Sequence, residues 1–537
     1  MTTRTDSPAA TQPQGSAWSP LSIPVFRGLW IASLASMIGT WMHDMGAGWL
    51  MTSLNPNPVM VALVQTATTL PMFLLALPAG ALADIVDRRR HLITVQVGLA
   101  IAAAFLGVLT LRGLTTAWLL LALTFTMGIG TAMLAPAWAA VTPEVVPRSE
   151  LRAAIALNTI AVNVARAIGP ALAGLIVAQL GTGAVFLLNA VSYVAVVIAV
   201  WTWRRQPSIS SLPTERFLSA MRTGVRYARH APELHAALLR GLTFFIFASA
   251  LWALLPLVAR QLVGGGPQTY GVLLTSMGLG AVGGAVLLPK VRQYLSNDAQ
   301  IVVGSWLYGG GMAAVAAFPI MPWVALAMAV SGVAWITVLA NLQIAAQLAL
   351  PDWVRARGLA VFMTVFMGSM AGSSVAWGAL ANAWGIPAVL LIAGAGSAIA
   401  SVLVQRFRIG GLEDLDLTPS MHWPSPAVHE SVTPDRAPVA VMIEYKVRPA
   451  DAAAFLTTLR ELGHSRRRDG AYFWDVLEDS QTPNLFVETF MSESWVEHLR
   501  QHERVTEVDR QLQEQLNRYL EPGTQPQIRH LLGPARR

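Results

Sequence analysis

A short charged segment between two long apolar runs decides the fold of this chain. It reads Gly80-Ala81-Leu82-Ala83-Asp84-Ile85-Val86-Asp87-Arg88-Arg89-Arg90. The runs on either side cover residues 59–82 and 92–111. Each is long enough to cross a bilayer, because ~30 Å of hydrocarbon needs about 20 helical residues. The segment is therefore predicted to be a loop at a membrane surface that joins two spans.

Apolar runs of this length recur along most of the chain. The 537 residues are 54% hydrophobic and only 12% charged, whereas a soluble chain carries about a quarter charged residues. We place twelve spans, near 28–50, 59–82, 92–111, 116–142, 153–179, 185–203, 241–259, 269–289, 299–317, 323–350, 358–383 and 388–405. This pattern predicts an all-α membrane protein, and the even number puts both ends of the set on one side.

Arginine and lysine are distributed unequally between the two sides. The loops near 83–91, 143–152, 203–240, 290–298 and 351–357 hold sixteen of them, and the alternate loops hold only Arg112 and Arg260. Because cytoplasmic loops carry the excess of positive charge, we expect both termini in the cytoplasm of a bacterium and the chain in its inner membrane. Basic chains also bind nucleic acid, but these arginines lie between spans, so we expect no nucleic-acid partner.

The only long connection between spans divides the membrane part into two bundles of six helices, an arrangement that places a substrate site at the midplane. We therefore divide the chain as follows: 1–25, a disordered cytosolic lead; 26–203, the first bundle; 204–240, a basic cytosolic linker; 241–408, the second bundle; 409–438, a second linker; and 439–537, a soluble domain.

The loop at residues 80–90 resembles that of the major facilitator superfamily between helices two and three, G-x-L-A-D-x-x-G-R-R/K. Gly80, Asp84, Arg89 and Arg90 match, and Asp87 stands where the family often has glycine. The resemblance implies the twelve-helix facilitator fold. It also implies a gate in which Gly80, Asp84, Arg88, Arg89 and Arg90 take part, with ion pairs that break and reform during alternating access.

The fifth span contains a second motif, Gly169-Pro170 followed by Gly174. A proline removes a helical hydrogen bond and bends the helix, and small residues permit close helix packing in lipid. The motif resembles the G-P-x-x-G-G signature of superfamily exporters, with one extra residue of spacing, and so implies an antiporter.

Charged side chains within the spans are rare, and each is a candidate functional group because charge is costly there. His43 and Asp44 lie in the first span and Arg166 in the fifth. We hypothesise that Asp44 couples transport to protons, that His43 relays the proton, and that Arg166 is a counter-charge or binds an anion. The alternatives are a structural Asp44–Arg166 pair or an Asp44 that lies in water at the outer surface.

Polar and aromatic neighbours extend this candidate site. Asn163 shares the helical face of Arg166, and Trp41 shares that of Asp44. The second bundle has no charge within its spans, so its candidates are Asn341 and Gln343, with Trp252 across the cavity. Charge on one side and aromatic or amide groups on the other suit an amphipathic organic molecule.

The segment 439–537 changes to mixed charge and alternating apolar residues. It predicts strands at 439–447, 471–478, 484–491 and 526–532 and helices after 449 and 492, the βαββαβ order of a ferredoxin-like α+β domain. Residues 487–490, Trp495 and His498 resemble small dimeric domains related to cofactor-free antibiotic-biosynthesis monooxygenases. We favour a dimerising or regulatory module over an enzyme, and expect His498 and His502, at i and i+4 on a polar helix, to be solvated.

The membrane part and the tail together resemble the transmembrane secretion effector branch, which is related to enterobactin exporters. The resemblance implies a proton-driven exporter of a drug, siderophore or secondary metabolite across the lipid bilayer. An importer, a permease with a sensing tail, and a transporter fused to a monooxygenase-like enzyme remain alternatives. We expect no enzymatic activity in the membrane part, no metal and no cofactor, and a possible homodimer through the tail.

Overall fold

The structure is a computed structural model that describes residues 18–147, 149–203, 217–411, 416–423, 432–433 and 435–534. Within helices it leaves out the side chains of residues 77, 81, 83–85 and 217–223. Residues 1–17 of the predicted disordered lead lie outside the described residues, as do residues 412–415, 424–431 and 434 of the predicted linker at 409–438.

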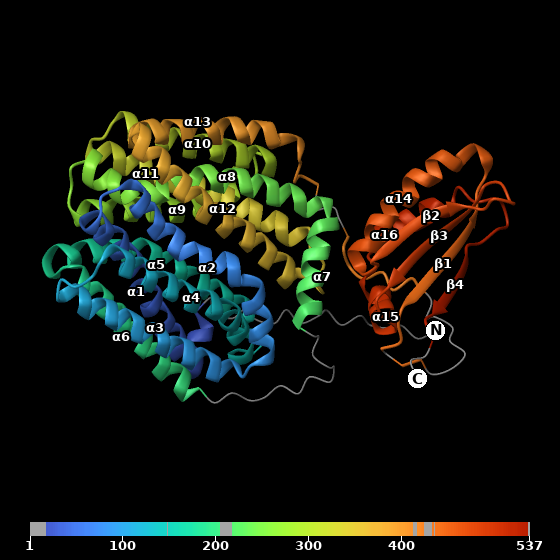
Figure 1. Cartoon of the computed structure of the whole chain (residues 1–537), viewed down its shortest axis with the longest axis horizontal. Helices are drawn as coiled ribbons and strands as arrows, with labels where there is room; N and C mark the ends of the chain where they lie inside the picture. Colours follow the sequence, from blue (N-terminus) through green and yellow to red (C-terminus); the bar gives the residue numbers. More distant parts are fainter. Residues whose placement is uncertain are drawn as a thin grey trace, which may run out of the picture.

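Twelve helices of the described part are long and apolar enough to cross a membrane, as predicted. Those of the first half are α1 (Pro24–Leu54), α2 (Pro58–Ile85), α3 (Arg88–Leu111), α4 (Ala117–Val145), α5 (Leu151–Leu180) and α6 (Thr182–Thr202). Those of the second half are α8 (Pro232–Leu257), continued by a π-helical turn at Val258–Leu262, α9 (Pro267–Val291), α10 (Asn297–Ala317), α11 (Met321–Leu348), α12 (Arg355–Trp384) and α13 (Ile386–Leu403). Figure 1 shows them side by side as one elongated bundle.

Local chemistry fixes where these helices begin and end. Prolines start α1, α2, α8 and α9, where the missing N–H has no helical partner to lose. The side chains of Asn57, Asp87 and Ser296 accept hydrogen bonds from the first turns of α2, α3 and α10. Gly181 and Gly385 stop α5 and α12 with φ of +81° and +82°, which a residue with a Cβ rarely adopts. The predicted spans therefore match the observed helices to within a few residues at most ends.

The connection between the halves differs from the predicted basic linker at 204–240. It contains a helix, α7 (Phe217–His230), and α8 already begins at Pro232. α7 lies across one end of the bundle, next to the tail (Figure 1). We call this end the tail side and the opposite end the far side.

The two halves meet along α5 with α9 and along α2 with α12. A Cβ placed on Gly271 of α9 would lie 2.6 Å from the Pro170 carbonyl oxygen of α5, so these helices touch backbone to backbone. Between α2 and α12, the Thr66 hydroxyl donates a hydrogen bond of 2.8 Å to the Ala371 carbonyl. Small residues thus bring the halves together, as is usual between helices in lipid.

The tail is a four-stranded antiparallel sheet with the strand order β2-β3-β1-β4, the ferredoxin-like arrangement predicted from the sequence. Its elements are β1 (Val439–Lys446), α14 (Ala452–Asp469), β2 (Phe473–Glu478), β3 (Leu485–Ser492), α15 (Trp495–Arg504), α16 (Glu507–Asn517) and β4 (Gln527–Leu532). Alternate residues of β1 and β3 are buried against the helices.

The core of the tail holds a buried carboxylate. Glu488 is fully buried and accepts hydrogen bonds from Tyr445 (2.9 Å), Arg466 (3.0 Å) and Trp474 (2.9 Å). Because a buried charge is tolerated only when it is paired and hydrogen-bonded, this set of four residues fixes α14 to three strands of the sheet.

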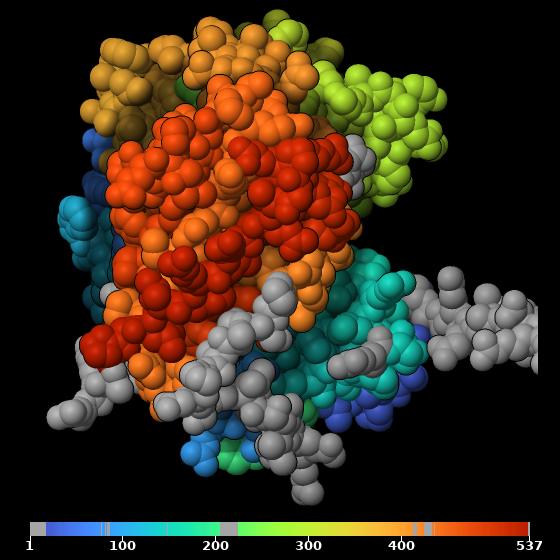
Figure 2. Space-filling model, turned by 90° about the vertical axis from the view of Figure 1, so that its right-hand side faces the viewer, coloured from blue at the N-terminus to red at the C-terminus, as the bar shows by residue number. Residues whose placement is uncertain are grey.

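The helices of the tail face the bundle, and the sheet lies on the side away from it (Figure 1). The Arg468 guanidinium lies 5.7 Å from the ring centre of Tyr227 in α7, and that of Arg504 lies 4.5 Å from Trp353, between α11 and α12. Figure 2, which looks at the tail side, shows the tail spread over this end of the molecule. The tail is therefore attached to the second half.

Candidate functional site

A cavity of about 280 Å³ lies between the two halves, near the middle of the bundle. Both halves supply its walls. Those of the first half include Trp41, Asp44, Gly48, Gln65, Thr68 and Arg166, and those of the second include Trp252, Tyr270, Trp335, Phe366 and Met370. Its position between two six-helix halves is where transporters of this architecture bind their substrates.

Asp44 faces this cavity from the middle of α1. Trp41, Asp44 and Gly48 all line it, because residues three and four apart share one face of a helix. A Cβ placed on Gly48 would lie 3.1 Å from the Tyr270 hydroxyl of the second half, so α1 and α9 are close here. The carboxylate that the sequence singled out therefore lies at the contact between the halves.

Arg166 reaches the same cavity from α5. Its guanidinium carbon lies 5.7 Å from the ring centre of Trp41, a distance at which a cation is attracted to an aromatic face. Its Nε and Nη1 atoms are buried and make no hydrogen bond. Among the described residues no ion pair joins Arg166 to Asp44, so the two charges face one cavity without locking α1 to α5.

His43 points to a different place from its neighbour. It is 2% exposed, and its ring centre lies 4.6 Å from that of Phe186 in α6. Neither ring nitrogen makes a hydrogen bond. One residue along a helix turns the side chain by about 100°, so His43 packs between α1 and α6 and does not line the cavity.

The other predicted polar residues are not among those that line the cavity. Asn163 donates a hydrogen bond to the Thr159 carbonyl of its own helix, at 2.9 Å. Asn341 is 2% exposed and donates to Gln300 of α10 at 3.0 Å, which makes it a link between α10 and α11. Gln343 is half-buried on α11.

Trp252 lines the cavity as predicted, and sequence reasoning missed three of its neighbours. Gln65, Tyr270 and Trp335 lie in spans that are otherwise apolar. The rings of Trp41, Trp252 and Trp335 form a row across both halves, with centres 6.4 Å and 5.5 Å apart. Gln65 could have been predicted, because a polar residue in the middle of a span is unusual. Tyr270 and Trp335 could not, because aromatic residues within a span more often only pack against neighbouring helices.

A second cavity of about 460 Å³ lies within the first half. Trp41 lines both cavities. The second one continues toward the tail side, where Phe26 at the start of α1 and Val145 at the end of α4 line it. The space around Trp41 is thus extended toward the tail side.

The far side of the cavity is closed by contacts between the halves. Arg260, after α8, donates hydrogen bonds to Thr52 (3.0 Å) and Ser53 (2.8 Å) at the end of α1. Its guanidinium also lies 5.7 Å from the ring centre of Trp49. We call Arg260, Thr52, Ser53 and Trp49 the far-side clasp.

The charged segment of residues 80–90, which was predicted to be a loop, forms the end of α2, a connection at residues 86–87 and the start of α3 on the tail side. Arg88 forms an ion pair with Glu144 of α4, and Arg89 donates hydrogen bonds to the carbonyls of Val200 (3.2 Å) and Trp201 in α6 (2.6 Å). The Arg90 N–H donates to the side chain of Asp87 at 2.8 Å. The side chain of Asp84 lies outside the described part.

The four motif residues that are glycine or proline differ in their surroundings. A Cβ on Gly169 would lie 2.6 Å from Cβ of Trp41, and one on Gly174 would lie 3.0 Å from the Pro267 carbonyl. Pro170, between them, is buried. A Cβ placed on Gly80, in the last two turns of α2, would meet no atom within 4 Å.

The fold and cavity define a class: a membrane transporter built from two six-helix halves, of the major facilitator type. Solved structures share this fold. A bacterial homologue of the iron transporter ferroportin, in its inward-facing state, aligns with a TM-score of 0.57 at 15% identity and covers 72% of this chain and 98% of that one. A POT family transporter in complex with 5-aminolevulinic acid aligns with a TM-score of 0.58 at 12% identity and covers 71% of this chain and 95% of that one.

The particular family follows from the sequence match. The chain belongs to the transmembrane secretion effector family, whose model matches residues 15–537, which confirms the predicted family. Relatives include the Staphyloferrin A transporter of Staphylococcus aureus, 24% identical over 52% of this chain and 70% of its own length. The Multidrug efflux pump Tap of Mycolicibacterium fortuitum is 24% identical over 67% of this chain and 90% of its own length. The Enterobactin exporter EntS of Salmonella typhimurium is 26% identical over 59% of this chain and 76% of its own length. The chain is thus a multi-pass membrane transporter of small molecules.

Proposed function

We propose that this transporter exports an amphipathic organic molecule in exchange for protons, by alternating access of the central cavity to the two sides of the membrane. The observation that carries the proposal is the place of Asp44: a carboxylate in the middle of a span, facing a cavity that both halves build. Carboxylates at this depth are costly and typically serve proton or substrate pathways. Export is supported by the names of two of the relatives, the Multidrug efflux pump Tap and the Enterobactin exporter EntS.

Asp44 suits proton coupling because nothing fixes its charge. A carboxylate held in an ion pair stays ionised, but the described residues form no ion pair with Asp44. Protonation would remove a charge from the contact between α1 and α9, which favours closing that contact. Deprotonation would leave a charge that calls for water or a cationic substrate group. The two protonation states would therefore favour different arrangements of the halves.

The lining suggests the chemistry of the substrate. The row of Trp41, Trp252 and Trp335 offers aromatic faces for a planar apolar group. Arg166, with two buried nitrogens unbonded, would bind an anionic group of the substrate, because guanidinium recognises carboxylate and phosphate well. We propose a substrate that joins an aromatic or apolar body to an acidic group.

Two sets of contacts would control access to the cavity. The far-side clasp joins the halves in this conformation. The pair Arg88–Glu144, with Arg89 bound to the end of α6, ties together the tail-side ends of α3, α4 and α6 within the first half. We propose that Gly80, Asp84 and Arg90 belong to this tail-side gate and that the tail side is cytoplasmic, since its loops hold nearly all the arginines.

The tail is proposed to be a dimerising module. The face of its sheet that points away from the helices exposes Phe473, Leu477 and Leu531, which are 44%, 60% and 51% exposed. These side chains lie on one surface, because Phe473 and Leu531 occupy the same register row across β2, β3, β1 and β4. Contiguous exposed apolar surface marks an interaction site.

Transport into inside-out vesicles with an acidic interior tests the proposal. Labelled enterobactin and a labelled macrolide serve as probes, with a fluorescent dye that reports proton efflux from the vesicle. We expect accumulation of at least one probe that a protonophore abolishes, and proton efflux on its addition. Asp44→Asn should abolish accumulation while binding to the purified protein remains. Asp435→Asn, at an exposed position before the first strand of the tail, is the matched control.

Each part of the proposal can fail separately. Accumulation by Asp44→Asn with unchanged dependence on the proton gradient would remove Asp44 from the coupling. Proton-driven accumulation in right-side-out vesicles instead would make the protein an importer. Arg166→Gln distinguishes the substrate class: it should weaken binding of an acidic probe but not of its methyl ester.

A further inference from the structure

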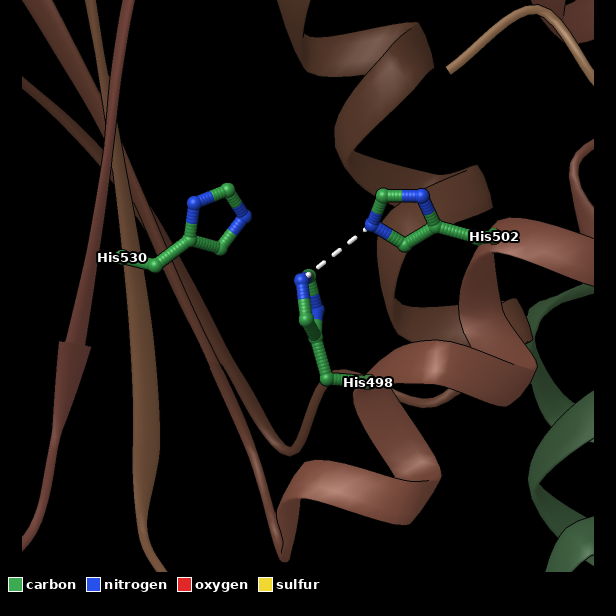
Figure 3. Close-up of side chains that lie close together, drawn as sticks. All are labelled: His498, His502 and His530. Carbon is green, nitrogen blue, oxygen red and sulfur yellow. Dashed lines mark hydrogen bonds between the residues drawn. The ribbon is translucent and has the colours of Figure 1, made fainter. Parts of the chain in front are cut away.

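Three histidines of the tail meet on the side of the sheet that its helices cover. His498 and His502 lie one turn apart on α15, and His530 lies on β4. His530 pairs with Val441 of β1, whose side chain is buried against the helices, so the register sends His530 to that same face. Figure 3 shows the three imidazoles turned toward one another. The prediction that His498 and His502 are solvated is wrong for His498, which is 1% exposed, whereas His502 is half-buried.

The spacing of the ring nitrogens suits a metal ion. Each histidine offers a nitrogen, and the three lie within 4.8 Å of one another. Nε2 of His498 and Nε2 of His502 are 3.2 Å apart. Two nitrogens of a tetrahedral zinc site, each bound at about 2.0–2.1 Å, are separated by about 3.3–3.4 Å. The pair on α15 therefore has nearly the required separation already, and His530 has to approach by up to about 1.5 Å.

The chemistry of the three rings also fits. Burial lowers the pKa of His498 to about 3, with the neighbouring His502 and His530 acting in the same direction. Burial likewise lowers the pKa of His502 to about 4 and lowers that of His530. Neutral imidazole is the form that binds metal. Nδ1 of His498 is buried and has no hydrogen-bond partner, so hydrogen bonding does not fully explain why this ring is buried.

The surroundings hold the rings in place and limit the site to three protein ligands. The ring centres of Trp495 and His498 lie 5.5 Å apart, and those of Trp423 and His502 lie 4.9 Å apart in an edge-to-face arrangement. Among the described residues no carboxylate or further histidine joins the group. The charge of Arg466 helps to lower the pKa of His498 and His502, and Arg466 forms an ion pair with Glu488 at 3.0 Å.

We propose that His498, His502 and His530 bind a divalent first-row metal ion, with Zn²⁺ as the preferred ion and one coordination position left for water or an anion. The ligand type supports this choice, since imidazole binds Zn²⁺, Cu²⁺ and Ni²⁺ in preference to Mg²⁺ or Ca²⁺. The chain has no cysteine, so no thiolate competes for the ion. The proposal replaces the expectation of no metal and does not depend on the direction of transport.

The metal would act on a defined part of the tail. It would fix α15 to β4 at the edge of the sheet. α15 ends at Arg504, whose guanidinium lies over Trp353 of the second half. Metal binding would therefore stiffen the helix through which the tail contacts the membrane part.

Equilibrium binding to the full-length protein in detergent, with any affinity tag removed, tests the site. The protein is stripped with EDTA, loaded with Zn²⁺, passed over a desalting column and analysed for metal content. Co²⁺ is used as a second probe, because a tetrahedral Co²⁺ site absorbs strongly in the visible range. We expect one Zn²⁺ per chain, a tetrahedral Co²⁺ spectrum and a higher melting temperature with Zn²⁺.

Variants link the binding to these residues. Loss of a group that only orients a metal ligand lowers affinity about 10- to 100-fold, so loss of a ligand should cost at least as much. We expect His502→Ala and His530→Ala to lose binding by that factor or more, and His464→Ala, at an exposed position on α14, to keep it. His502→Gln, checked for an unchanged elution volume, guards against misfolding.

Two results would overturn the proposal. One is less than a tenth of a Zn²⁺ per chain in the stripped and reloaded wild-type protein. The other is binding that His502→Gln and His530→Ala leave within twofold of His464→Ala, which would place the ion elsewhere.

Discussion

Removing the far-side clasp should open the cavity toward the far side. Arg260 donates two hydrogen bonds, at 3.0 Å to Thr52 and 2.8 Å to Ser53, and stacks on Trp49. A hydrogen bond to a charged group contributes about 1.5–3 kcal/mol. Arg260 and Ser53 are exposed, however, so water competes for these hydrogen bonds, and each of the two contributes about 0.5–1 kcal/mol. The exposed cation–π contact adds about 0.5–1 kcal/mol. Together these contacts favour far-side closure by about 2 kcal/mol, a factor of about 30 in the population of the open state.

Because the chain has no cysteine, a single introduced thiol reports on access to the cavity. Thr68→Cys places it on the cavity wall, and labelling by a membrane-impermeant maleimide from the far side measures the open population. We expect Arg260→Ala to raise the labelling rate about 10- to 30-fold. Arg112→Ala removes the other far-side arginine and should leave the rate unchanged. An equal rate in Arg260→Ala and Arg112→Ala would refute the idea that the clasp holds the halves closed.

Two further changes test the helix contact and the proposed dimer. In α9, Gly271→Val places a side chain 2.6 Å from the Pro170 carbonyl oxygen, and the backbone must move to relieve this overlap, at a cost of about 1–3 kcal/mol. We therefore expect transport into vesicles to fall at least tenfold. Gly283→Val is the control on the same helix, because its side chain meets open space, and it should leave transport unchanged. Leu531→Glu puts a charge on the exposed sheet face and should weaken dimerisation at least tenfold by light scattering after size exclusion, whereas Gln511→Glu on α16 should not. Normal transport in Gly271→Val, or a Leu531→Glu protein that elutes and scatters as the wild type does, would contradict the respective prediction.

The membrane fold was largely predictable because the bilayer imposes simple rules. A span must be apolar over a fixed length, and every backbone group must be bonded within the helix, so composition alone located twelve helices. The strands of the tail were predictable from alternation, which a sheet with one buried face produces. α7 was missed because its basic residues were interpreted as loop charge, although they also lie on one face of a short amphipathic helix.

The candidate site was only partly predictable. A charge such as Asp44 is visible in an apolar run, and the helical period then identifies Trp41 on the same face. His43 shows the limit of that reasoning, because adjacency in sequence directs neighbouring side chains to different surfaces. Residues contributed by the other half, such as Tyr270 and Trp335, depend on how the halves pack, and no local pattern records that packing. The same holds for His530, which joins His498 and His502 only through the register of β4.

The way in which the tail is attached limits what it can do to transport. Its described contacts with the membrane part involve α7 and Trp353, which belong to the connection and to the second half. In an alternating-access cycle the halves rock against each other, so the tail would move with the second half. The tail also contacts α7, and α7 packs against both α12 of the second half and α2 of the first half. A ligand in the tail can therefore alter transport by changing the contact at Trp353 or the contact with α7, because a ligand shifts an equilibrium only when it binds the two states with different affinity.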